Sequence, residues 1–188
     1  MGSTRVALYP GANAAAIAVM SSSADAMIRL SGSMGRTPTS MLVTRRAVAR
    51  LSTSPKRIPQ QANLAIDGNP DTAWSTVTYK DAVPFPKFIE GMGLLLHLPE
   101  PTALSAVTID VSSTGTQVQI RSSPIDAPAK LTDTTELTPT TPLQPGHNRI
   151  AVHDRTKTSN VLVWISTLGT TDGESRTEIS EITLRAAA

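Results

Sequence analysis

Short apolar runs that alternate with polar residues dominate the chain from about residue 90 to its end. Val107, Ile109 and Val111 alternate with Thr108 and Asp110, so the two sets point to opposite faces of an extended segment. This period of two predicts β-strands rather than helices. The runs that predict strands are 93–98, 106–111, 116–121, 148–152, 160–167 and 180–185.

Clusters of Pro, Gly, Asn, Asp and Ser separate these runs, as expected of turns between strands. No sustained helical period occurs between them, so a βαβ arrangement is not indicated. The pattern favours an all-β fold, an antiparallel sandwich or barrel. Residues 122–146 hold five of the fourteen prolines and are predicted to form a long surface connection, with at most one short strand near Leu137.

The first 60 residues differ from the rest of the chain in their hydrophobic pattern and in their charge. Residues 12–30 have a loose apolar face that predicts a weak helix, and residues 35–61 show no period and are typical of a linker or of disorder. Residues 1–60 contain eight Lys and Arg against one acid, whereas residues 61–188 contain nine bases and fourteen acids. We therefore divide the chain into a basic segment of low order, 1–61, and a folded domain, 62–188.

Composition narrows the function classes. The net charge is only +2, and the basic segment holds a single aromatic residue, so no nucleic-acid partner is expected. The absence of cysteine excludes disulfides and thiol chemistry. No run of eighteen apolar residues and no clear signal-peptide core is present, so this chain alone is not expected to span a membrane.

The stretch NLAIDGNPDTAWST, residues 63–76, concentrates oxygen-bearing side chains in a tight turn. Asp67, Asn69 and Thr72 supply carboxylate, amide and hydroxyl oxygens, and Gly68 and Pro70 allow the backbone to bend. Two interpretations stay open. The oxygens could bind a cation such as calcium, which takes six to eight oxygen ligands, or they could cap the backbone N–H groups of the turn.

Two motifs carry a resemblance to a known group of domains. AIDGNPDTAWST at 65–76 and EITL at 181–184 resemble the first hairpin and the last strand of the discoidin-like, galactose-binding-like (coagulation factor type C) domains. The resemblance implies a jelly-roll β-sandwich over 62–188, with Trp74 and Trp164 in its core. It also implies that a structural calcium, where present, would be bound by Asp67, Asn69, Thr72 and Glu181; no cofactor is required.

The similarity from about Ala62 to the C-terminus extends to a narrower group, the extracytoplasmic C-terminal domain of actinobacterial MviN/MurJ-type lipid II flippase proteins. That context implies a location outside the cytoplasm and attachment to the membrane only through a parent protein. This chain lacks the flippase helices and pseudokinase of that architecture. We therefore hypothesise a truncated or frame-disrupted remnant, in which residues 1–61 are not native to the domain.

The function implied is that of a non-catalytic binding module, with a cell-wall glycan or an extracytoplasmic protein as partner. No metalloprotease, nucleophile-elbow or phosphate-loop motif occurs, so an enzyme is not predicted. An interaction or spacer domain without a small ligand is the alternative. In such sandwiches loops at one end contact the ligand, and the candidates are Tyr79, Phe85 and Phe88 in one loop and Asp172, Glu174 and Arg176 in another.

Overall fold

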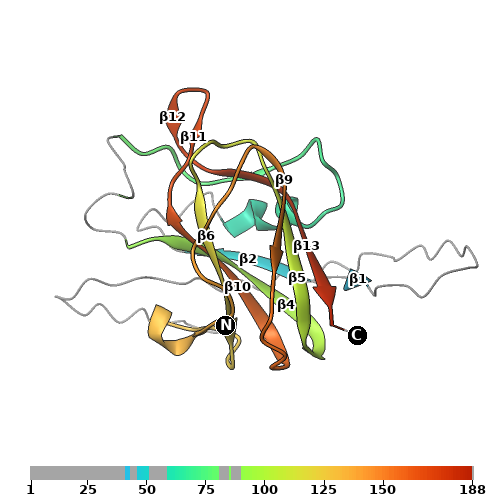
Figure 1. Ribbon diagram of the computed structural model, residues 1–188. Helices are drawn as coiled ribbons and strands as arrows, with labels where there is room; N and C mark the ends of the chain where they lie inside the picture. The colour runs from blue at the N-terminus through green and yellow to red at the C-terminus, as the bar shows by residue number, and fades with distance from the viewer. Residues whose placement is uncertain (1–40, 43–45, 51–58, 81–84, 86–89, 188) are drawn as a thin grey trace, which may run out of the picture.

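The computed structural model describes residues 41–42, 46–50, 59–80, 85 and 90–187. Within these ranges the chain forms two large antiparallel sheets packed face to face, a separate two-stranded sheet and two short 3-10 helices (Figure 1). The predicted all-β sandwich is therefore confirmed. The helix expected over 12–30 lies outside the described residues.

One sheet has five strands among the described residues and is called the five-stranded sheet. Its order is β1-β13-β5-β9, with β3 also paired to β13. The strands are β1 (Met41–Leu42), β13 (Glu178–Ala186), β5 (Leu104–Val111), β9 (Gly146–Ala151) and β3 (Trp74–Ser75).

The other sheet has six strands among the described residues and is called the six-stranded sheet. Its order is β2-β4-β10-β6-β7, with β8 also paired to β6. The strands are β2 (Arg46–Arg50), β4 (Met92–Thr102), β10 (Thr158–Thr167), β6 (Gln117–Ser123), β7 (Thr135–Glu136) and β8 (Thr141–Pro142).

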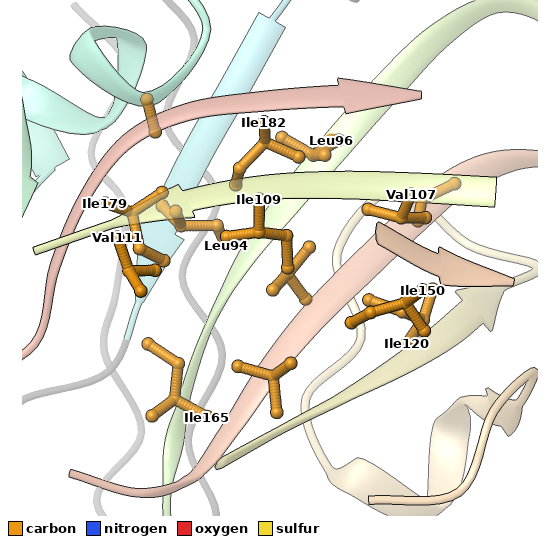
Figure 2. Packing of buried hydrophobic residues seen from close by; sticks show 14 of the residues in the cluster. Leu94, Leu96, Val107, Ile109, Val111, Ile120, Ile150, Ile165, Ile179 and Ile182 are labelled. Carbon is orange, nitrogen blue, oxygen red and sulfur yellow. The ribbon is translucent and has the colours of Figure 1, made fainter. Parts of the chain in front are cut away.

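Each of the six predicted strands is present, and its observed ends lie within four residues of the predicted ones. The apolar residues of the alternating runs fill the space between the sheets, as Figure 2 shows for the strands around Ile109. Fully buried residues come from both inner faces, for example Leu94 and Leu96 of β4 and Ile109 of β5. A smaller cluster of Leu95, Leu162 and Trp164 lies apart from this core, on the alternate residues of β4 and β10.

Two expectations need correction. The connection 122–146 contains two short strands rather than at most one, because β7 and β8 both pair with the edge of β6; it also contains the helix η2 (Leu131–Asp133). The boundary at Ala62 also differs from the structure. β1, β2 and the start of the helix η1 (Pro59–Ala65) lie ahead of it, and Ala62 and Ala65 themselves are fully buried in the core.

Candidate functional site

The loops of the two sheets gather at two opposite ends of the sandwich. One end holds the loop that follows β5, the loop that follows β10 and the segments that lead into β4 and β13. Figure 1 shows the hairpin of β11 (Thr170–Thr171) and β12 (Glu174–Ser175) projecting from this end, away from the end of β13. We call it the hairpin end.

The sequence predicts GTTDGESR as a loop, and the structure forms it as a hairpin. Asp172 and Gly173 both have positive φ, 54° and 78°, which is the backbone of a two-residue type I′ turn. Asp and Gly are the residues that tolerate this conformation best, so the dipeptide Asp172-Gly173 favours the turn of the hairpin by its own backbone preferences.

The hairpin is hydrogen-bonded on both sides to the rest of the hairpin end. On one side, Thr114 and Thr170 exchange backbone hydrogen bonds of 3.0 and 2.8 Å. On the other side, the Tyr79 N–H donates to the Ser175 carbonyl at 3.0 Å. The two predicted ligand loops, around Tyr79 and around Asp172, are therefore adjacent in the structure.

A buried network of hydroxyl groups holds these loops in place. The Ser113 hydroxyl accepts hydrogen bonds from the Glu178 N–H at 2.7 Å and from the Thr171 hydroxyl at 2.9 Å. The Thr177 hydroxyl accepts from the Gly169 N–H at 3.0 Å and lies 3.2 Å from the Thr116 hydroxyl. Because polar groups buried in this way are satisfied, the hairpin end is a preorganised surface.

Sequence reasoning missed this network. It interpreted the Ser-Ser-Thr-Gly stretch at 112–115 only as a separator between two strands, and Thr116 as the first residue of the second strand. Ser113 and Thr116 are fully buried, which is unusual for turn residues. The concentration of hydroxyl side chains around a glycine was the available signal, but it does not say which loops the hydroxyls join.

Arg176 lies at the centre of the charged side chains of the hairpin end. Its guanidinium is 3.0 Å from Asp172, 3.2 Å from Glu178 and 3.6 Å from Glu174. Asp172 and Glu174 have side chains that are 83% and 54% exposed, so both retain carboxylate oxygens that face solvent. The set provides hydrogen-bond acceptors and a fixed guanidinium donor, which is chemistry suited to hydroxyl groups of a ligand.

Tyr79 and Phe85, the aromatic residues of the first loop that the structure describes, do not form an open platform. Tyr79 and Phe85 pack edge to face, with ring centroids 6.2 Å apart and planes at 71°. Phe85 is buried in the core and Tyr79 packs against that core. Phe88 lies outside the described residues.

Both tryptophans are interior residues, with Trp74 1% and Trp164 3% exposed. Trp74 belongs to the main core, whereas Trp164 belongs to the smaller cluster, where its ring lies against Gly91 and Gly93 at the start of the neighbouring strand β4. Neither indole is available for stacking on a sugar in this arrangement.

The turn at 67–72 brings together the residues predicted to bind calcium, but their oxygens already have partners. The Asp67 carboxylate accepts from the Asn69 N–H at 2.9 Å and from the Thr72 hydroxyl at 2.7 Å. Asn69 Oδ1 accepts from the Asp71 N–H, and the Glu181 carboxylate accepts from the Gly68 N–H at 2.9 Å. The turn is thus capped internally and tied to β13.

Glu181 is the carboxylate that ties this turn to β13, and its surroundings bear on the calcium hypothesis. Within the described ranges, no group of three or more His, Asp or Glu side chains is placed to hold a metal ion. Partial burial raises the pKa of Glu181, and the negative charges of Asp67 and Asp110 act in the same direction, while N–H groups of Gly68 and Ile182 oppose the shift. The raised pKa thus follows first from the partial burial of the carboxyl group, and the two neighbouring negative charges add to it.

We expect Glu181→Gln to change the pH dependence of the protein's stability. We expect calcium to leave that stability unchanged. Because the folded pKa of Glu181 is raised, its contribution to stability is present below the unfolded value of about 4.5 and is lost as pH rises through the folded value. In thermal melts, the melting temperature of Glu181→Gln should therefore rise relative to that of the wild type between about pH 4 and pH 7. The glutamine can still accept the Gly68 hydrogen bond.

The same melts, repeated with calcium and with a chelator, test the alternative that the turn at 67–72 binds calcium. A calcium site would raise the melting temperature of the wild type at neutral pH by mass action, by about 2.7 kcal/mol at a hundredfold excess over the dissociation constant, and would not raise that of the variant. Such a difference would contradict the interpretation of the turn as internally capped.

No family model matches the chain, but its fold is similar to that of several solved carbohydrate-binding modules. A chitosan-binding module from a chitosanase/glucanase of Paenibacillus sp. IK-5 is 15% identical, with a TM-score of 0.58 over 78% of this chain and 98% of the module. A family 32 carbohydrate-binding module from a family 31 glycoside hydrolase of Clostridium perfringens is 15% identical, with a TM-score of 0.57 over 78% and 95%. The family 32 module of NanJ from C. perfringens, solved with galactose, is 16% identical, with a TM-score of 0.53 over 77% and 96%.

These similarities establish the fold class. The chain has the galactose-binding-like β-sandwich that the discoidin-like resemblance implies, and it spans nearly the full length of the modules that it matches. The three similar structures named above are carbohydrate-binding modules. None of the helices in the described part of the chain is long and apolar enough to cross a membrane.

Proposed function

We propose that this protein is a carbohydrate-binding module that recognises glycans with the hairpin end of its sandwich. The observation that carries the proposal is the convergence of two loops, distant in sequence, into one preorganised polar surface. Tyr79 and Ser175 join these loops directly, and Asp172, Glu174 and Arg176 project from the hairpin. The fold shared with carbohydrate-binding modules supports this assignment but does not identify the sugar.

The ligand class that we propose is cell-wall glycan. The support is the resemblance of residues 62–188 to the extracytoplasmic domain of MviN/MurJ-type flippase proteins, which act in peptidoglycan synthesis. In that context the module is located outside the cytoplasm, and the binding role requires no cofactor or catalytic group.

A second candidate is a protein-interaction or spacer domain. The burial of Phe85, Trp74 and Trp164 favours it, because binding modules often use an exposed ring to stack on sugars. Failure to bind any glycan, with the fold intact, would support this second function.

A glycan array probed with the full chain tests the proposal, together with Asp172→Asn and Glu174→Gln. Asparagine tolerates the positive φ at position 172, so both variants remove charge without altering the turn. Because a hydrogen bond to a charged group is worth about 1.5–3 kcal/mol, each variant should weaken binding by about tenfold or more at unchanged melting temperature.

The matched control is Asp154→Asn, in the loop between β9 and β10 at the opposite end of the sandwich. Asp154 accepts a hydrogen bond from the Thr156 N–H, and asparagine can do the same. The control should bind as the wild type does. Equal losses in all three variants would mean that overall charge, not the hairpin end, governs binding.

A further inference from the structure

Residues 41–50 supply an edge strand to each sheet. β1 pairs with the end of β13, and β2 pairs with β4 over five residues, from Arg46 opposite His97 to Arg50 opposite Gly93. In each sheet the strand from this segment is the outermost one. One short stretch therefore closes the same side of both sheets.

The sequence of β2 suits this position. Ala47 and Ala49 are the register partners of Leu96 and Leu94, which are fully buried in the core. Arg46, Val48 and Arg50 alternate with these alanines. An alternating pattern of this kind is expected of a strand with two different faces.

The edge of β4 is itself divided into two parts. The part that β2 covers, residues 93–97, contains no proline, so no N–H group that faces β2 is missing; the alternate N–H groups face β10 on the other side of β4. The part beyond it contains Pro99, Glu100 and Pro101. Proline and charge are the features that protect an open edge from pairing. Only the 93–97 part is suited to receive a strand.

The match to the similar modules is longer than the predicted domain 62–188. They cover 78% of the 188 residues, or about 147 residues, whereas Ala62 to Ala188 comprises 127. The shared fold therefore includes residues ahead of Ala62. This agrees with the sheet pairing of residues 41–50.

We propose that residues 93–97 of β4 form a strand-acceptor site, which binds an extended five-residue segment in antiparallel register, with residues 46–50 as its occupant in this chain. Backbone hydrogen bonds supply the affinity, and small residues opposite Leu94 and Leu96 supply the selectivity. The site is distinct from the hairpin end and does not depend on glycan binding. It accepts the same segment from the same chain or as a separate peptide.

Amide hydrogen exchange in the full chain tests this site with Ala47→Pro and Val48→Pro. Alternate N–H groups of an antiparallel strand face its partner, so one of the two variants removes a hydrogen bond to β4. In that variant, exchange in residues 93–97 should accelerate by about tenfold or more, because their edge partner is lost. The control Ala26→Pro, ahead of β1, should leave this exchange unchanged.

A synthetic peptide of residues 44–52 should then restore protection of residues 93–97 in the sensitive variant, and the same peptide with Val48→Pro should not. If the proline variants do not fold, Val48→Gly weakens the strand while keeping every N–H, and the same readouts apply. Unchanged exchange in both proline variants, or no restoration by the wild-type peptide, would overturn the proposal.

Discussion

Trp74→Ala is expected to lower the free energy of unfolding by about 3–5 kcal/mol, a large share of the stability of an ordinary domain. Trp74 is 1% exposed, lies in the main core, and sits on β3, which joins the turn at 67–72 to β13. Truncation leaves a cavity where the two sheets meet this connection. Urea denaturation followed by circular dichroism measures the loss.

Trp74→Phe is the matched control. The indole Nε1 is buried and has no hydrogen-bond partner, so phenylalanine loses volume but no hydrogen bond. It should destabilise much less than alanine does. A Trp74→Ala variant that keeps the wild-type stability but loses glycan binding would place this ring in the binding site instead of the core.

Gly169→Ala is expected to destabilise the protein by about 1–3 kcal/mol and to weaken glycan binding. A Cβ at this position would contact the Thr116 hydroxyl, lie 2.7 Å from the Ser113 Cβ and 3.0 Å from the Thr114 carbonyl. These groups belong to the network that holds the hairpin, so the clash displaces the surface that we propose binds glycans. Thermal melts and glycan titration would show both losses together.

Gly173→Asn serves as the control for this substitution. Gly173 lies in the hairpin turn at φ 78°, which asparagine tolerates, and no atom lies within 4 Å of its added Cβ. Its melting temperature should fall much less than that of Gly169→Ala, because only the backbone conformation opposes the new side chain. If the melting temperature of Gly169→Ala lies within about 1 °C of that of the wild type, the buried hydroxyl network is not tightly packed.

The sequence predicts the main strands well because each alternates cleanly and ends at a turn. Val107, Ile109 and Val111 illustrate the reason: the period of two follows directly from the two faces of a sheet. β2 was missed because arginines surround its short alternation and its neighbours are Ser, Thr and Pro. A strand at a sheet edge is specified by the partner that it meets, and the partner is not visible in a local pattern.

The candidate site was predicted only as two separate loops. Nothing in the spacing of Tyr79 and Ser175, almost one hundred residues apart, shows that their backbones pair. The link between Gly68 and Glu181 likewise followed from a family resemblance rather than from the residues themselves. Such contacts depend on the topology of the sandwich, which brings together loops from different strands.

Chemical-shift mapping by NMR, with the full chain and an oligosaccharide selected on the array, tests the central claim most directly. Binding at the hairpin end predicts that the largest shifts occur in residues 78–80, 112–115 and 170–176, with little change in residues 124–134 and 152–157 at the opposite end. Shifts concentrated at that opposite end, or on the outer face of either sheet, would contradict the assignment of the binding surface.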